Sequence, residues 1–168
     1  MITYRDATPA DAPALATLGA SSFTETFGHL YAPADLDLFL ENHTTAFWSA
    51  ELADPAFAVR VVEADGALIA YAKLGPPQLP FTPSTGATEL RQFYVLAPWH
   101  GAGIAAALME WVIETARARH AGELFLSVFT DNHRARRFYA RYGFEPVGTY
   151  AFMVGTHADE DIVMKLAL

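Results

Sequence analysis

The most informative part of this sequence is a glycine-rich segment that reads Val95-Leu96-Ala97-Pro98-Trp99-His100-Gly101-Ala102-Gly103-Ile104-Ala105-Ala106. Leu90 to Leu96 before it are typical of a strand, and Ile104 to about Arg119 after it carry apolar side chains at helical spacing. The glycines therefore lie between a strand and the N-terminus of a helix. Free backbone N–H groups and the positive end of the helix dipole make such a place suitable for binding anions, phosphates in particular.

Two other phosphate loops can be compared with this segment. Gly101, Gly103 and Ala106 satisfy the dinucleotide pattern G-x-G-x-x-A, but that loop turns directly from strand into helix, whereas Leu96 to His100 intervene here. The acidic residue of that pattern also ends the second strand, whereas Glu123 precedes one. No Gly-Lys-Ser/Thr follows, which excludes a P-loop. Taken alone, a glycine loop that only packs stays an alternative.

The remaining pattern predicts one α/β (α+β) domain over residues 1–168, with strands and helices in the order βααβββαβαββ. A hairpin implies antiparallel pairing and the strand–helix–strand unit at 90–129 implies a parallel crossover, so we expect a mixed, mostly antiparallel sheet flanked by helices. The other expected elements are a strand at 2–7, helices at 8–27 and from 33 towards 47, hairpin strands at 57–62 and 67–74, a strand at 124–129, a helix at 132–142, and strands near 148–154 and 162–166.

Composition narrows the classes of function. The chain has 168 residues, 52% of them hydrophobic, and a net charge of -8, so a compact domain is expected and binding to nucleic acid or anionic membranes is not. Residues 91–141 carry seven arginines and four acids, a net +3, which leaves -11 for the remainder. There is no cysteine and no signal-like N-terminus, so we expect a cytoplasmic protein. Six scattered histidines give no metal-ligand spacing, so no metal is expected.

A second motif lies at residues 132–144, which read Asn-His-Arg-Ala-Arg-Arg-Phe-Tyr-Ala-Arg-Tyr-Gly-Phe. It resembles the segment Asn-x-x-Ala-x-x-Phe-Tyr-x-Lys/Arg-x-Gly-Phe of the GNAT superfamily of N-acetyltransferases. His100 to Ala105 resemble the superfamily's pyrophosphate loop Gln/Arg-x-x-Gly-x-Gly/Ala, with His100 in place of Gln or Arg. The order of elements along nearly the whole chain is similar too. The resemblance implies a GNAT fold and an acyl-CoA-dependent N-acetyltransferase that uses acetyl-CoA.

The resemblance also implies which residues would hold the cofactor. The strand end would bind the pantetheine arm, with the Val95 N–H facing the acetyl carbonyl oxygen, and the glycine loop would bind the pyrophosphate. Asn132 would contact the CoA arm, or cap the helix that it opens, and the two roles are compatible. The full expected set is Phe93, Tyr94, Val95, Leu96, His100, Gly101, Ala102, Gly103, Ile104, Ala105, Asn132, Ala135 and Tyr139.

Two residues are candidates for proton transfer. Glu89 matches the glutamate that many GNAT enzymes use as a base, and since a carboxyl pKa near 4.3 disfavours direct abstraction from an ammonium, we expect a water relay or a raised pKa. Tyr139 matches the family's general acid at the leaving thiolate, acting as a hydrogen-bond donor or proton donor. The alternatives are a surface acid at a strand end for Glu89 and a core aromatic residue for Tyr139.

The acceptor is expected to be a small-molecule amine. Phe23 to Phe27, residues 89–95 and the last two strands resemble the bacterial PaiA-type polyamine acetyltransferases, and Glu25 and Asp161 are candidates for binding a cationic substrate. An amino acid, an antibiotic or a protein N-terminus are alternative acceptors, and a CoA-binding regulatory module without turnover is an alternative function. The proline-rich loop Gly75 to Thr88 is expected to border the acceptor site. Whether the protein is a monomer or a homodimer is left open.

Overall fold

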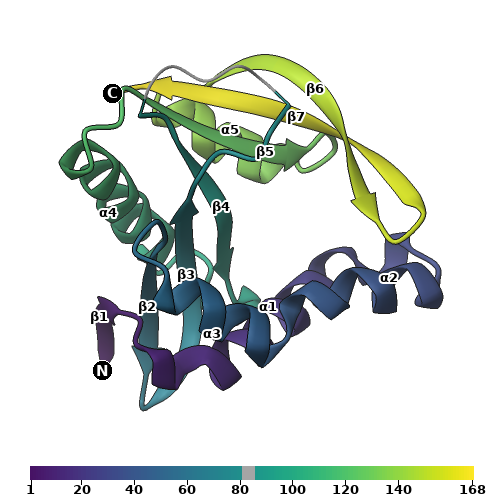
Figure 1. Cartoon of the computed structure of the whole chain (residues 1–168), viewed down its shortest axis with the longest axis horizontal. Coiled ribbons are helices and arrows are strands. Elements are labelled where there is room, and N and C mark those ends of the chain that lie inside the picture. Colours follow the sequence, from purple (N-terminus) through teal and green to yellow (C-terminus); the bar gives the residue numbers. More distant parts are fainter. Residues whose placement is uncertain (81–85) are drawn as a thin grey trace.

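A computed structural model of the chain describes residues 1–80 and 86–168. Its centre is a seven-stranded sheet in the order β1-β2-β3-β4-β5-β7-β6 (Figure 1). Among the described strands β4 and β5 form the one parallel pair, and all other neighbours are antiparallel. The strands are β1 (Ile2–Asp6), β2 (Ala58–Ala64), β3 (Ala67–Gly75), β4 (Thr88–Val95), β5 (Glu123–Phe129), β6 (Glu145–Val154) and β7 (His157–Ala167). The mixed, mostly antiparallel sheet that the sequence predicts is confirmed.

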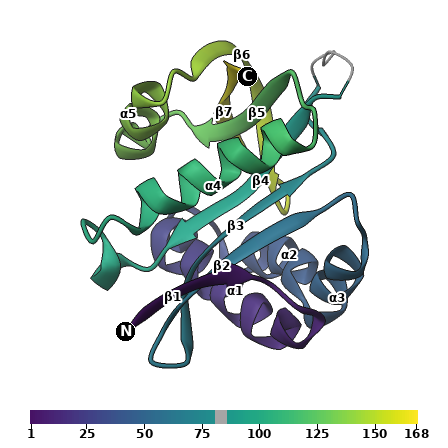
Figure 2. The ribbon, with the colours of Figure 1, turned by 90° about the vertical axis from the view of Figure 1, so that its left-hand side faces the viewer.

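Helices cover both faces of this sheet. The helices are α1 (Ala12–Phe27), α2 (Pro33–Leu40), α3 (Thr45–Ala53), α4 (Ile104–Ala118) and α5 (His133–Arg141). Leu15 and Leu18 of α1 pack with Trp48 of α3 and Tyr71 of β3 in one apolar cluster. Leu108 and Val112 of α4 belong to the larger cluster on the opposite face, together with Tyr139 of α5. Figure 2 shows α4 and α5 on one side of the sheet and α1 to α3 on the other. None of the described helices is long and apolar enough to cross a membrane.

The second predicted helix, from Pro33 towards Phe47, is divided into two. Helix α2 ends at Leu40, a short 3-10 turn follows over Glu41–His43, and α3 begins at Thr45. Thr44 has extended backbone angles, and its side chain accepts a hydrogen bond from the Phe47 N–H at 3.4 Å. Threonine favours this capping position because its hydroxyl satisfies a free N–H of the first turn. The order is therefore βαααβββαβαββ, with one helix more than expected.

Strand β4 contains the irregularity that positions the site. Its register with β3 shifts so that Lys73 lies opposite Gln92 and Leu74 opposite Leu90, which leaves Arg91 as a bulge. After the bulge Phe93 lies opposite Ala72 and Tyr94 opposite Tyr71. Because residues directly opposite one another share a face of the sheet, Phe93 faces α4 and Tyr94 faces α1.

Strands β4 and β5 separate soon after they meet. They pair only at Thr88 with Leu124 and at Glu89 with Phe125, while β5 continues to Phe129 along β7. The backbone edge of β4 after Glu89 therefore faces an opening between two strands of the sheet (Figure 1). This split connects the two faces of the sheet.

Candidate active site

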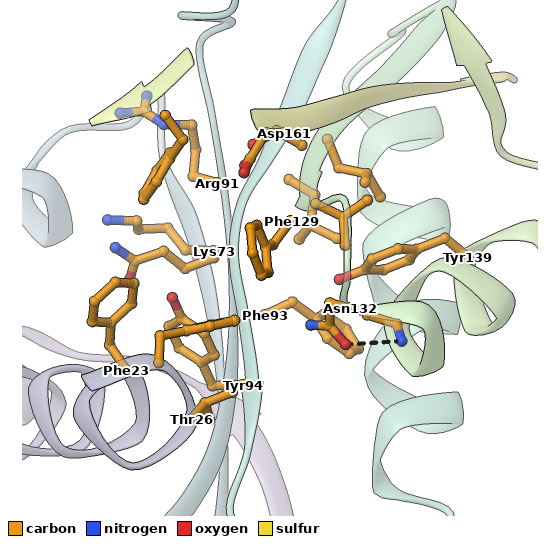
Figure 3. A pocket seen from close by; sticks show the side chains of 18 of the residues that line it. Phe23, Thr26, Lys73, Arg91, Phe93, Tyr94, Phe129, Asn132, Tyr139 and Asp161 are labelled. Carbon is orange, nitrogen blue, oxygen red and sulfur yellow. Dashed lines mark hydrogen bonds between the residues drawn. The ribbon is translucent and has the colours of Figure 1, made fainter. Parts of the chain in front are cut away.

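A cleft of about 1240 Å³ runs through the split between β4 and β5. On one side it is lined by the glycine loop and α5, and on the other by α1, α2 and the β6–β7 hairpin. Figure 3 shows Tyr139 of α5 and Asn132, which precedes α5, facing the opening, with Tyr94, Lys73 and Phe23 on the far side. Most predicted residues line this cleft, although the Tyr94 side chain, expected at the cofactor, lies on the far side. We call the side of the glycine loop the cofactor side and the other the acceptor side.

The glycine loop on the cofactor side has the geometry of an anion site. Gly101 and Gly103 have φ angles of 82° and 81°, in the left-handed region that favours glycine. A Cβ at either position would have nothing within 4 Å, so the backbone lies open to a ligand. The first helical bond of α4 runs from the Ala107 N–H to the Gly103 carbonyl, so the three preceding N–H groups have no partner within the helix. These groups can donate to a phosphate.

The role of Gly103 in binding CoA can be tested with a second glycine as a matched control. Gly66, in the β2–β3 turn, has φ 84° and equally open surroundings, but it does not line the cleft. Each glycine-to-alanine substitution should lower the free energy of unfolding by about 1 to 2 kcal/mol, because each forces a side chain into the left-handed region. Only Gly103→Ala should also weaken acetyl-CoA binding, by at least about tenfold, since its methyl group obstructs the phosphate. Calorimetric titration and urea unfolding measure the two effects, and equal CoA affinity in both variants would contradict the assignment of the loop.

His100 connects the loop to its surroundings. Its Nε2 donates to the Val95 carbonyl at 2.8 Å, and its Nδ1 accepts from Arg134 Nη1 at 2.5 Å. The ring therefore ties the end of β4 to the first turn of α5. Arg134 is a cofactor-side residue that the motif match does not assign, since only the fold brings it to His100. The Leu96 N–H donates to Ile69 of β3, so the Val95 N–H points the other way, into the split.

The other predicted cofactor residues divide into two groups. Phe93, Tyr94, Ala105 and Ala135 line the cleft, as do Asn132 and Tyr139. Leu96, Ala102 and Ile104 do not, and the Ile104 side chain is buried in the core beneath α4. Ile104 can take part through its backbone N–H, whereas the N–H groups of Leu96 and Ala102 already donate to the Ile69 and Trp99 carbonyls.

Tyr139 and Asn132 are held by α5. The Tyr139 ring is 8% exposed and contacts Phe93, Phe138 and Phe144, with ring centres 5.6 to 6.3 Å apart. Burial raises the pKa of its hydroxyl, which keeps it protonated and able to donate at neutral pH. Asn132 Oδ1 accepts from the Ala135 N–H at 3.3 Å, so Asn132 caps the helix and its amide nitrogen stays available.

Glu89 is buried at the junction of β4 and the proline-rich loop. Its Oε1 accepts from the Gln78 N–H at 2.9 Å, and its Oε2 lies 3.3 Å from Arg91 Nε. Burial raises the pKa of Glu89, while the Gln78 N–H and Arg91 act in the opposite direction. Gln78 and Leu79 line the acceptor side, as expected of this loop. The part of the loop at residues 81–85 lies outside the described residues.

Asp161 lies on the acceptor side, opposite Phe129 of β5 and Tyr150 of β6. It is 5% exposed, and its carboxylate accepts a hydrogen bond from the Ser127 hydroxyl. Burial and the neighbouring Asp159 carboxylate raise the pKa of Asp161 to about 7. Glu25, by contrast, is exposed and does not line the cleft, because Phe23, Thr26 and Phe27 form the face of α1 that does. The structure brings Asp161 to the site and leaves Glu25 outside it.

The buried Asp161 predicts a pH dependence of stability. Between about pH 4 and about pH 7 the folded protein keeps a proton that the unfolded chain has released, so the free energy of unfolding falls as the pH rises through this interval. Asp161→Asn should remove this contribution, and Glu160→Gln, at an exposed neighbour, should not. Urea unfolding of the three proteins at several pH values measures the slopes. Equal slopes in Asp161→Asn and the parent would contradict the placement of Asp161.

Apart from Tyr94, the aromatic side chains of the acceptor side were not predicted as site residues. A signal was present at Phe23 and Phe27, which are four residues apart and therefore share a helix face. The others come from distant segments, so no local pattern groups them. Six of the aromatic residues that line the cleft on this side are Phe23, Phe27, Tyr31, Phe39, Phe129 and Phe152, and we call these six the aromatic wall. Phe47, Tyr94 and Tyr150 line the cleft as well.

Comparison with known proteins defines the class. The model of the acetyltransferase (GNAT) family matches residues 18–144. An uncharacterized N-acetyltransferase of Mycobacterium tuberculosis is 36% identical over 155 residues, which cover 92% of this chain and 96% of that protein. The chain therefore belongs to the GNAT family and is an acyl-CoA-dependent N-acetyltransferase, which confirms the class expected from its two motifs.

Solved structures support the same fold. The PaiA N-acetyltransferase from Thermoplasma acidophilum, in complex with coenzyme A, is similar with a TM-score of 0.79 at 17% identity, over 100% of this chain and 99% of that one. The ribosomal-protein-alanine N-acetyltransferase from Brucella melitensis is similar with a TM-score of 0.70 at 27% identity, over 99% of each chain.

Proposed function

We propose that this protein transfers an acetyl group from acetyl-CoA to a primary amine by direct attack, with both substrates bound together. The observation that carries the proposal is the split between β4 and β5, which joins an anion-binding loop on one face of the sheet to a buried carboxylate on the other. An acetyl group that the pantetheine arm of CoA carries into the split would meet an amine held at Asp161. The sequence contains no cysteine that could carry the acetyl group.

The cofactor side would bind acetyl-CoA, which supplies the activated acetyl thioester. Within the segment Gly101 to Ala105, the N–H groups other than that of Ala102, which donates to the Trp99 carbonyl, would hold the pyrophosphate, and Arg134 would add positive charge beside it. The Asn132 amide and the free edge of β4 would bind the pantetheine arm. The Val95 N–H, which points into the split, would donate to the acetyl carbonyl oxygen, where negative charge develops during attack.

Two side chains would take part in proton transfer and hydrogen bonding during the reaction. A primary ammonium with a pKa near 10.4 must lose its proton before attack, which costs about 4.6 kcal/mol at pH 7. In our proposal Glu89 accepts this proton through a water molecule, because its own oxygens already accept from Gln78 and lie against Arg91. The amine nitrogen then forms the bond to the acetyl carbon, the carbon–sulfur bond breaks, and the Tyr139 hydroxyl donates to the leaving thiolate.

The acceptor in this proposal is a small cationic amine whose ammonium group binds Asp161. A polyamine is one candidate, because the sequence resembles the PaiA-type polyamine acetyltransferases and the fold is similar to that of a PaiA N-acetyltransferase. Similarity to a ribosomal-protein-alanine N-acetyltransferase favours a protein N-terminus as the alternative. Both acceptors present an amine that is protonated in water, so the catalytic groups would serve either.

Thiol release from acetyl-CoA tests the proposal. The purified protein is incubated with acetyl-CoA and a panel of small amines, polyamines, amino acids and N-terminal peptides. We expect thiol release above the rate without acceptor for at least one primary amine. Tight binding of acetyl-CoA with no release for any acceptor would instead support a CoA-binding module without turnover.

A further inference from the structure

The acceptor side has few charges that are not already neutralised. Lys73 donates to Glu51 and lies over the Trp48 ring, with its Nζ 4.5 Å from the ring centre. Glu89 is paired with Arg91. Among the described residues, the cations Lys73 and Arg91 and the carboxylates of Glu89, Asp159 and Asp161 line this side. The two contacts therefore engage both cations and one of the three carboxylates.

The two remaining carboxylates, those of Asp159 and Asp161, differ in their hydrogen-bond partners. Asp159 accepts from the Tyr31 hydroxyl at Oδ2 and lies 3.1 Å from His157 Nε2 at Oδ1, so each oxygen has a donor. Asp161 is the more deeply buried, and it accepts from the Ser127 hydroxyl, which is uncharged. Ionisation of a buried carboxylate is stabilised by an adjacent cation. The acceptor side therefore offers one strong position for a single ammonium group.

The largest apolar part of this side is the aromatic wall, and polar side chains such as Asn42 and Gln92 line the cleft as well. Phe23 lies at its centre, with ring centres 5.3 Å from Phe27, 5.9 Å from Tyr31 and 4.3 Å from Phe39. Phe39 contacts Phe152 at 5.6 Å, and Phe27 contacts Phe129 at 6.2 Å. Except for Phe23, which is buried, these side chains are partly exposed. The wall thus presents a continuous apolar surface beside Asp161.

Polar contacts between distant segments hold the wall in place. The Tyr31 hydroxyl bonds to Asp159 of β7, and Asp35 of α2 accepts from the Thr156 N–H at 2.8 Å and its hydroxyl at 2.7 Å. A Cβ at Gly155 would lie 2.5 Å from the Asp35 Cα, so the turn of β6 and β7 approaches α2 as closely as glycine allows. Figure 1 shows this turn against α2. The apolar surface is therefore preformed, which favours binding of a rigid group.

We propose that the acceptor is a monoamine whose single ammonium group is attached to an aromatic or similarly bulky apolar body. This inference rests on the proposed function. The ammonium group would pair with Asp161 while the apolar body covers the aromatic wall and removes it from water. A polyamine would also have to dehydrate its other ammonium groups against rings, at positions where the described carboxylates are already engaged.

Three amines test the inference with the parent enzyme. They are 2-phenylethylamine, propylamine, which has the ammonium group without the ring, and spermidine. We expect kcat/KM for 2-phenylethylamine to exceed that of each of the other two by at least about tenfold, because an apolar group that fills a pocket discriminates at this level or above.

Variants of the wall separate recognition from folding. Phe39→Ala should bring the ratio of kcat/KM for 2-phenylethylamine to that for propylamine close to one. The ratio is measured within one preparation, so it does not depend on the fraction of folded protein. Leu38→Ala changes the neighbouring residue on α2, which is 48% exposed and outside the cleft, and should leave the ratio at the parent value.

The outcomes distinguish this inference from the proposed function. Highest activity with spermidine, or equal activity with propylamine and 2-phenylethylamine, would overturn the inference and leave acetyl transfer to amines supported. An unchanged ratio in Phe39→Ala would likewise overturn it. No thiol release with any amine would overturn both.

Discussion

Tyr139→Phe should lower kcat for acetyl transfer by about 10-fold to 100-fold and leave acetyl-CoA affinity unchanged. The substitution keeps the ring and its contacts with Phe93 and Phe144, so α5 should stay in place. It removes the hydroxyl that would donate to the leaving thiolate, and a hydrogen bond to a charged group is worth roughly 1.5 to 3 kcal/mol. Because burial raises the pKa of Tyr139, complete proton transfer becomes costlier, and donation of a hydrogen bond is the role that we expect.

Tyr142→Phe is the matched control for this prediction. Tyr142 follows Tyr139 by three residues at the end of α5 and packs on Phe138, but it does not line the cleft. Its variant should keep the parent kcat. Parent activity in Tyr139→Phe would remove this hydroxyl from the chemistry, and equal losses in the two variants would indicate damage to α5.

Glu89→Gln should lower kcat at saturating amine by about 100-fold, the lower end of what a positioned acid or base contributes. The amide oxygen can still accept from the Gln78 N–H, so the attachment of the proline-rich loop is preserved. What is lost is the ability to take the proton of the amine. Since burial raises the pKa of Glu89, the parent kcat should fall on acidification at a pH above the ordinary carboxyl range, and this fall should be absent in the variant.

Glu145→Gln serves as the control for charge alone. Glu145 is an exposed carboxylate at the start of β6, outside the cleft, and its variant should retain the parent rate and pH profile. A Glu89→Gln enzyme that keeps both the rate and the pH profile would exclude Glu89 as the proton acceptor.

The cofactor side could be predicted from the sequence because each part of it is local. The glycine loop lies within residues 95–106, and Asn132 caps the short helix that contains Tyr139, so two short motifs that resemble those of the GNAT superfamily assign them. The contact of His100 with Arg134 could not be predicted in this way. It joins residues 34 positions apart across two elements, and only the crossover through α4 and β5 brings them together.

The acceptor side depends on contacts between the two ends of the chain. Tyr31 and Asp159 are 128 residues apart, and Asp35 and Thr156 are 121 apart. Asp161 could be proposed from its charge, but its burial follows from the pairing of three strands, which no local pattern shows. Glu25 could be proposed on the same ground, but its position on α1 turns its side chain away from the cleft. The break between α2 and α3 also depends on a short cap at Thr44 within a stretch that is otherwise helical in character.

The most direct test of acetyl transfer by direct attack combines product analysis with the intact mass of the protein. The enzyme is incubated with acetyl-CoA with and without an accepted amine, and mass spectrometry quantifies CoA, N-acetylated amine and protein. We expect CoA and N-acetylated amine in equal amounts, and protein of unchanged mass in both samples. CoA released without acetylated amine, or protein that gains an acetyl group and passes it to the amine, would contradict the account.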